Sequence, residues 1–473
     1  MDSRLRPSQT LLLGSLVFGL FFGAGNLIFP AQLGREAGQA VLAACAGFLI
    51  TAVGLPVLGV VASAVSGSRS VHAMVDPVSR RYALFFTCAL YLTIGPLFAI
   101  PRTATVSFEV GVRPLVGEGG PWLLLFSLAF FAVTAAVALR PGRLMDWIGR
   151  YLTPIFLVLL SALVVAALVR PMTTEPLAAP VDRYAGHALS AGLIDGYNTM
   201  DALASLAFAI VIVDAARRLG VNTPRRLAVE LGKAGVVGGL GMAVVYAALA
   251  YIGATSVGAV PEADNGGVLL AATSRHYFGA AGQYLIAAIV LVACLKTSIG
   301  LIAACARMFS ELGRLRSAAG DSPTDGSVAE RSYVPWALGF VLVSFAIANA
   351  GLETIIGVSL PVLMFLYPLA IVTIVFGLGW SRARRHLVVV RCTLAFTALA
   401  AFFDLLAALP EGLATTPVVT ALTGAAGRVL PGFEVGFGWV VPALVGFAVG
   451  VALDAAGRTR RTPARSGDES LAG

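Results

Sequence analysis

The residues best suited to chemistry lie near the N terminus, where glycine and asparagine interrupt a run long enough to cross a membrane. The uncharged run 11–30 contains Gly23, Ala24, Gly25 and Asn26. Each glycine disfavours a helix by about 1 kcal/mol relative to alanine, and asparagine prefers to bond nearby backbone. A helix broken within the membrane would offer free N–H groups to a carboxylate and free carbonyls to a cation. The alternative is a glycine-lined seam for helix packing.

A second irregular stretch, residues 194–201, precedes the apolar run 202–213, which is too short to cross a membrane alone. Asp201 lies thirteen residues before Asp214, about 20 Å along a helix, so we expect its carboxylate within the membrane. Intramembrane carboxylates tend to face partners or water-filled pathways. Asp201 could also cap a half-helix, and the two roles are compatible.

Two basic residues also fall inside or beside apolar segments. Lys296 lies eleven residues before Arg307, about 16 Å along a helix, so we expect it near mid-depth. There it should be paired, neutral through loss of hydration, or pointed into a cavity. Arg102 follows Pro96 and Pro101, which predict a kink or a helix end. The simpler interpretation of Arg102 is a side chain that reaches the membrane interface.

The composition of the chain indicates the elements that hold these residues. It is 58% hydrophobic and 12% charged, whereas soluble domains contain about 25% charged residues. The net charge of +8 does not indicate nucleic-acid binding, because most basic residues fall on one side of the alternating apolar segments. By the positive-inside rule, both termini are then cytoplasmic. The five cysteines show no metal-binding or disulfide pattern, and we expect no cofactor.

Apolar segments of spanning length predict about twelve transmembrane helices in a single transporter domain, residues 1–455, within the lipid bilayer. They are expected near residues 9–30, 40–64, 82–101, 121–139, 149–169, 190–213, 232–256, 280–306, 333–349, 354–379, 388–409 and 435–454. The polar stretch 312–332 is predicted to be a mobile cytoplasmic loop. Residues 456–473 are predicted to form a disordered cytoplasmic tail.

Several stretches resemble the bacterial branched-chain amino acid carrier (system II) family, cation symporters of the amino acid–polyamine–organocation superfamily. They are residues 23–30, 47–58, 95–111, Met200 with Asp201, and 359–361. The resemblance implies an all-α membrane fold with two inverted five-helix repeats, about 9–169 and 190–379, and two extra helices, about 388–454. Helices 1 and 6 would be broken, and the two irregular stretches fall on those positions.

The resemblance also implies a set of site residues around the two breaks. Those expected to bind substrate are Gly23, Ala24, Gly25, Asn26, Ala204, Ala207 and Phe208. Those expected to couple an ion are Gly19, Phe22, Asn26, Asp201, Lys296 and Thr297. A sodium ion is expected at Asn26 and Thr297. Lys296, however, stands where sodium-coupled relatives place a hydroxyl, so the coupling ion is expected to be sodium or a proton.

The implied function is import of leucine, isoleucine and valine across a bacterial inner membrane by alternating access. One methylene is worth about 1–3 kcal/mol, so the three should compete. The alternative is a carrier of another small neutral amino acid or related solute. A channel would need a symmetric pore. An intramembrane aspartyl protease would need a Gly-x-Gly-Asp context, which neither Asp195 nor Asp201 has, so we expect no enzyme.

Overall fold

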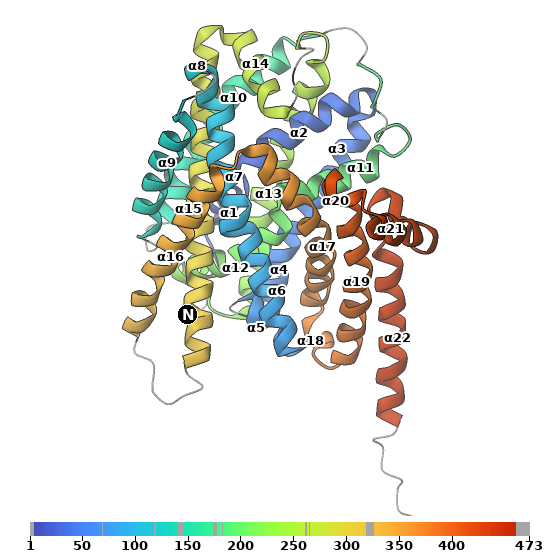
Figure 1. The fold of residues 1–473 in the computed structure, drawn as a ribbon. Helices are drawn as coiled ribbons and strands as arrows, with labels where there is room; N and C mark the ends of the chain where they lie inside the picture. The colour runs from blue at the N-terminus through green and yellow to red at the C-terminus, as the bar shows by residue number, and fades with distance from the viewer. Residues whose placement is uncertain are drawn as a thin grey trace, which may run out of the picture.

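The computed structural model describes residues 4–68, 70–117, 120–140, 145–173, 177–181, 183–260, 263, 265–317 and 326–459. Within these ranges every regular element is a helix (Figure 1). The last helix extends to Thr459, so it includes residues 456–459 of the predicted tail. The rest of the predicted tail, residues 460–473, lies outside the described residues. Helices also extend into both ends of the predicted loop 312–332, of which residues 318–325 lie outside the described ranges.

The first half of the chain folds into helices that account for the first five predicted spans. In order they are α1 (Pro7–Phe21), α2 (Ala24–Ala37), η1 (Gly38–Ala40), α3 (Val41–Leu49), η2 (Ile50–Gly54), α4 (Leu55–Ser66), α5 (Val71–Val75), α6 (Arg80–Leu92), η3 (Thr93–Leu97), α7 (Ala99–Val106), η4 (Ser107–Val112), α8 (Arg113–Val116), α9 (Trp122–Ala138), η6 (Met145–Leu152) and α10 (Thr153–Val169).

The second half supplies the remaining spans and, between them, four α-helices that the sequence analysis did not predict: α14 and α21, and the short α18 and α20. In order its elements are α11 (Ala188–Asp195), η7 (Gly196–Thr199), α12 (Asp201–Arg218), α13 (Pro224–Thr255), α14 (Gly266–Phe278), α15 (Ala280–Ser317), α16 (Gly326–Ala348), α17 (Leu352–Leu378), α18 (Trp380–Ala383), α19 (Leu387–Ala407), α20 (Glu411–Ala414), α21 (Pro417–Val429), η8 (Phe433–Val435) and α22 (Val440–Thr459).

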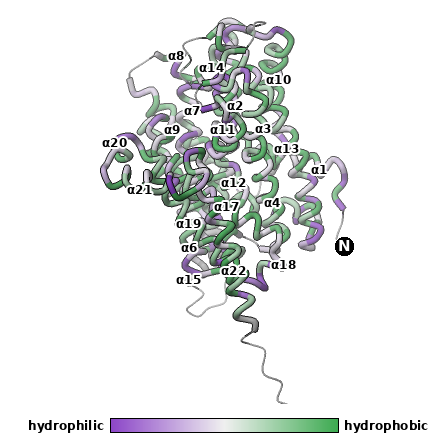
Figure 2. Tube along the Cα trace, turned by 90° about the vertical axis from the view of Figure 1, so that its right-hand side faces the viewer, coloured by the Kyte–Doolittle hydropathy of each residue, from purple (hydrophilic) through white to green (hydrophobic). Residues whose placement is uncertain are grey.

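The described helices agree with the prediction of about twelve membrane spans. Seven helical stretches are long and apolar enough to cross a membrane, and the bent pair of α11–η7 and α12 makes up to eight. Four shorter apolar helices match the predicted first, fourth, ninth and twelfth spans: Pro7–Phe21, Trp122–Ala138, Ser332–Ala348 and Val440–Ala456. Figure 2 shows that hydrophobic residues predominate along the helices. The chain is therefore an all-α integral membrane protein.

Two spans are broken where the sequence predicted it. Phe22 and Gly23 adopt extended backbone conformations between α1 and α2. In the sixth span α12 bends by 41° from the preceding helix, and the break falls at Met200, with φ of 63°. Met200 is the one non-glycine residue with positive φ among the described residues, a conformation that costs about 1–2 kcal/mol for an L-residue.

Each broken span packs against one particular neighbour by close backbone contact. α2 lies on α13 and α11 lies on α3 (Figure 1). A Cβ atom added at Gly253 of α13 would lie 2.0 Å from the Ala31 carbonyl oxygen, and one at Gly47 of α3 would lie 2.1 Å from the Leu189 carbonyl oxygen. Small residues allow such approach between membrane helices. Two related repeats would produce this pairing of span 1 with span 7 and span 6 with span 2.

Candidate functional site

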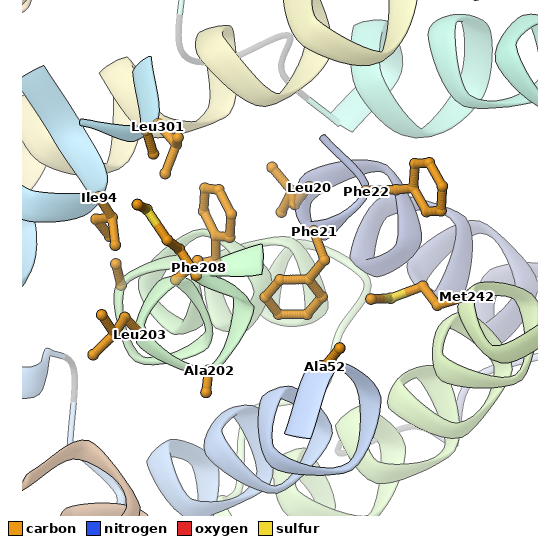
Figure 3. Packing of buried hydrophobic residues seen from close by; sticks show 14 of the residues in the cluster. Leu20, Phe21, Phe22, Ala52, Ile94, Ala202, Leu203, Phe208, Met242 and Leu301 are labelled. Atoms are coloured by element: carbon orange, nitrogen blue, oxygen red, sulfur yellow. The ribbon is translucent and has the colours of Figure 1, made fainter. Parts of the chain in front are cut away.

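A cavity lies between the two breaks and is lined by both apolar and polar residues. The apolar lining residues are Leu20, Phe21, Ile94, Ala99, Met200, Ala204, Phe208 and Leu301. The other lining residues are Gly23, Gly25, Asn26, Arg102, Thr103, Thr199, Asp201 and Thr297. Figure 3 shows Leu20, Phe21 and Phe208 gathered between the ends of the helices. The cavity has a volume of about 30 Å³, which is too small for an amino acid.

A hydrogen-bonded cluster joins the two broken spans. The Asn26 amide Nδ2 donates to the Asp201 carboxylate at 2.5 Å and also contacts the Tyr246 hydroxyl. Tyr246, from α13, donates to the same carboxylate oxygen at 3.2 Å. Asn26 Oδ1 accepts from the backbone N–H of Gly23 at 3.0 Å. Asn26 therefore stabilises the unwound turn and binds Asp201 at the same time.

The position of Asp201 bears on both predicted roles. Met200, not Asp201, is the N-cap of α12, and no side-chain cap is found there. The Asp201 carboxylate bonds Asn26 and Tyr246 of other spans and Thr199 of its own. The capping interpretation is therefore wrong in its strict form, although a carboxylate in the first turn still favours the helix dipole. Asp201 is 3% exposed and lines the cavity, as the pathway interpretation requires.

Thr297 of α15 contacts the break in the first span. Its hydroxyl donates to the Phe22 carbonyl at 3.2 Å. A Cβ atom at Gly23 would lie 3.0 Å from both the Thr297 Cγ2 and Oγ1 atoms. The Thr297 hydroxyl and the Phe22 carbonyl, two of the groups named in the predicted ion site, therefore lie within hydrogen-bond distance of each other. Gly19 packs instead against α10, since a Cβ atom there would lie 2.2 Å from the Thr153 hydroxyl.

Lys296 is turned away from this ion site. Its ammonium lies between the rings of Phe18, Phe22 and Phe156, with Nζ 4.4 Å from the centre of the Phe156 ring. Lys296 is fully buried, and its Nζ has no hydrogen-bond partner. No donation from Lys296 to carbonyls of the first span is found among the described residues, and Lys296 neither reaches the interface nor contacts Asp201.

The sixth span presents only part of the predicted set to the cavity. Ala204 and Phe208, one turn apart on α12, line it, whereas Ala207 does not. The Ala207 carbonyl accepts a hydrogen bond from the Tyr91 hydroxyl of α6 at 3.3 Å. Successive helical residues point about 100° apart, which explains why Ala207 is not among the lining residues while Ala204 and Phe208 are.

Arg102 lies at the cavity and not at the membrane interface, so the simpler prediction for it was wrong. It is 4% exposed, and its Nη2 atom donates to the Asn198 carbonyl at 3.0 Å. The guanidinium carbon lies 5.4 Å from the centre of the Phe29 ring. Gly95, with φ and ψ of −95° and −124°, breaks the third span just before Arg102. The two prolines predicted that break, and it was the feature of the sequence that could have indicated a site at Arg102. No feature of the sequence indicated that Tyr246 belongs to the site.

Asp195 does not belong to this cluster. Its carboxylate bonds the Arg183 guanidinium at 2.8 Å and the Tyr184 hydroxyl, and Arg183 also pairs with Glu36 of α2 at 3.0 Å. Asp201 instead bonds Asn26 and Tyr246. Since the two carboxylates have separate partners, they do not form the dyad that an aspartyl protease would need.

Two broken membrane helices around a cavity lined by buried polar residues define the class of the protein as an integral membrane transporter. A solved structure of MHP1, a nucleobase-cation-symport-1 family transporter in a closed conformation with bromovinylhydantoin bound, has a similar fold. The TM-score is 0.54 at 15% sequence identity, with 98% of this chain and 97% of that chain covered.

The chain belongs to the family described as "Branched-chain amino acid transport protein", which it matches over residues 6–456. It is 44% identical to the branched-chain amino acid permease BrnQ of Lactobacillus delbrueckii subsp. lactis, over 95% of this chain and 97% of that protein. It is 39% identical to the branched-chain amino acid permease BraB of Bacillus subtilis (strain 168), over 96% of this chain and 97% of that protein. The branched-chain amino acid transport system 3 carrier protein of Pseudomonas aeruginosa is 43% identical to this chain, over 84% of this chain and 87% of that protein. The family is one of transport proteins and not of enzymes.

Proposed function

We propose that the protein is a secondary active transporter that imports leucine, isoleucine and valine across a bacterial inner membrane, with both termini in the cytoplasm. The observation that carries the proposal is the cavity between the breaks, whose polar lining residues suit the charged groups of an amino acid and whose apolar lining residues suit a branched hydrocarbon side chain. The names of its relatives as branched-chain amino acid permeases support the same substrates.

The small volume of the cavity supports alternating access as the mechanism. A space of about 30 Å³ cannot admit leucine, so the helices around it have to move apart for substrate to enter or leave. α2 and α11 lie on one side of the two breaks, and α1 and α12 lie on the other. Tilting one set of half-helices at a time would open the cavity to one side of the membrane and keep it closed to the other.

The driving ion is proposed to be a cation, sodium or a proton. A sodium ion would bind at Thr297 and the Phe22 carbonyl, which already approach within 3.2 Å, with Asn26 nearby across the break. Oxygen ligands of this kind suit a hard cation. A proton-coupled cycle would use the buried Asp201 carboxylate, which lies in the same cavity. A gradient of either ion would then bias the exchange between the two open states.

The test is uptake of labelled leucine into proteoliposomes, with sodium and pH gradients imposed separately. The proposal predicts accumulation above the external concentration under one of the two gradients, and competition by excess isoleucine and valine. Counterflow should occur when unlabelled leucine is loaded inside without any gradient. Flux without saturation or counterflow would indicate a channel, and competition by alanine or glycine instead of valine would indicate a carrier of another amino acid.

A further inference from the structure

We infer that Arg102 and Asp201 form a two-point site for a zwitterion, in which Arg102 binds the α-carboxylate of the substrate and Asp201 binds its α-ammonium. The inference rests on the proposed function and assigns the recognition of the amino acid head group to two residues of different spans. Both side chains are buried, with 4% and 3% exposure, and both line the cavity between the breaks.

The first argument is the incomplete pairing of Arg102. A guanidinium carries five N–H donors, and the hydrogen bond found for that of Arg102 goes to a backbone carbonyl, that of Asn198. None of the ion pairs found among the described residues contains Arg102. An intramembrane charge without a contacting counterion is costly and is a functional-site hypothesis by default. A carboxylate matches the forked geometry of arginine better than any neutral group.

The second argument is the position of the Arg102 guanidinium between the two breaks. Asn198, its hydrogen-bond acceptor, lies in η7 just before the strained Met200. A Cβ atom at Gly25, in the first turn of α2, would lie 3.1 Å from the Arg102 Nη2 atom. The first N–H groups of a helix have no intrahelical acceptor. Arg102 therefore adds a full positive charge to a turn whose backbone already favours an anion.

The third argument is the orientation of Asp201. Asn26 and Tyr246 both donate to its Oδ2 atom, and Thr199 of the same span also bonds the carboxylate, so three side chains hold it in place. An ionised carboxylate can accept about four hydrogen bonds. Asp201 and Arg102 line one cavity without forming an ion pair with each other. A molecule with adjacent carboxylate and ammonium groups would neutralise both charges at once.

The test is direct binding to the purified full-length protein, read as ligand-induced rise in melting temperature over a concentration series. The probes are L-leucine, leucinamide, which lacks the carboxylate, and 4-methylpentanoate, which lacks the ammonium. Arg102→Gln is expected to weaken leucine binding about 10- to 100-fold and to leave leucinamide binding unchanged. Asp201→Asn is expected to weaken leucine binding similarly and to leave 4-methylpentanoate binding unchanged. Arg113→Gln, an exposed arginine that pairs with Glu109 in the same span, is the matched control.

The outcomes separate the inference from the proposed function. If wild type binds leucine and Arg102→Gln weakens leucine and leucinamide equally, Arg102 only maintains the cavity, and the inference is overturned. Unchanged leucine binding by either variant would overturn it as well. A wild type that binds none of the probes would overturn the proposed function itself. If Arg102→Gln fails to fold, Arg102→Lys keeps the charge but not the fork, and should still weaken leucine selectively over leucinamide.

Discussion

Asn26 and Asp201, 175 positions apart in the chain, are joined by a hydrogen bond of 2.5 Å that links the breaks in the first and sixth spans. Both residues are nearly fully buried. The bond makes the conformation of one half-helix depend on that of the other. A transporter that opens its two halves in turn needs such a link at the centre, since a ligand can shift the equilibrium only through contacts that differ between the states.

Asn26→Ala is expected to lower leucine uptake by roughly 5- to 150-fold, because loss of a buried hydrogen-bond partner costs about 1–3 kcal/mol. The variant would remove the contacts of Asn26 with Asp201 and with the backbone N–H of Gly23. Initial uptake rates in proteoliposomes measure the effect, with the amount of inserted protein measured in the same vesicles. Wild-type rates in this variant would leave only a packing role for the glycine-rich stretch.

Gly25→Ala is expected to impair transport strongly, and Gly25→Leu to abolish it, without loss of membrane insertion. An added Cβ atom would lie 2.9 Å from the Phe29 ring and 3.1 Å from the Arg102 guanidinium, so the new side chain would fill the turn against Arg102. Gly357→Ala in α17 is the control, because a Cβ atom there meets nothing within 4 Å. Equal uptake by Gly25→Ala and Gly357→Ala would contradict the assignment of this turn to the substrate site.

The breaks could be predicted from sequence because they are local. Glycine and asparagine in the first span and proline in the third disfavour a helix wherever the run packs, and the apolar run of the sixth span is too short to cross a membrane alone. The interruptions near Gly23, Gly95 and Met200 could therefore be predicted. The inward position of Arg102 could not be predicted from the sequence, since it depends on how the third span is rotated after its kink. The same limit applied to Tyr246, whose hydroxyl meets Asp201 only when α13 packs beside both broken spans.

The positions of the site residues on α15 depend on the same rotation. Lys296 and Thr297 are adjacent, and a rotation of about 100° per residue sends Thr297 to the Phe22 carbonyl and Lys296 into the aromatic cluster. Lys296, Thr297 and Ser298 are consecutive polar residues that point to different sides of the helix, so the sequence pattern did not indicate which of them faces the first span. The fold could therefore be predicted to the level of spans and breaks, and the site only to the level of segments.

Gly253→Val is expected to lower the melting temperature of the purified protein by several degrees. Its Cβ atom would lie 2.0 Å from the Ala31 carbonyl oxygen and 2.9 Å from the Arg35 nitrogen, so α2 would have to shift from α13. Overpacking of this kind costs about 1–3 kcal/mol or more. Gly232→Val in the same helix is the matched control, since the nearest atom there is 3.8 Å away. The intrinsic effect of valine on helix stability is common to the Gly253→Val and Gly232→Val variants. Equal melting temperatures of the two variants would contradict the close contact between Gly253 of α13 and Ala31 of α2.

Thr297→Val and Lys296→Met are expected to separate the ion site from its neighbour. Thr297→Val keeps the shape of the side chain and removes the hydroxyl that contacts the Phe22 carbonyl, so cation-driven leucine accumulation should fall about tenfold, in line with loss of a buried polar contact. Lys296→Met fills the space between Phe18, Phe22 and Phe156 with an unbranched apolar chain. Because Lys296 contacts none of the ion-site oxygens in the described residues, accumulation should persist with the same ion dependence.

The measurement for this pair is leucine accumulation in proteoliposomes under a sodium gradient, with choline in place of sodium, and under a pH gradient. Thr297→Ser, which keeps the hydroxyl, should restore most of the accumulation that Thr297→Val loses. The opposite pattern would count against this assignment: if Lys296→Met lost its dependence on the driving ion while Thr297→Val kept it, the ammonium would take part in coupling. Lys296 would then have to leave the aromatic cluster during the cycle, because within the cluster its Nζ atom has no hydrogen-bond partner.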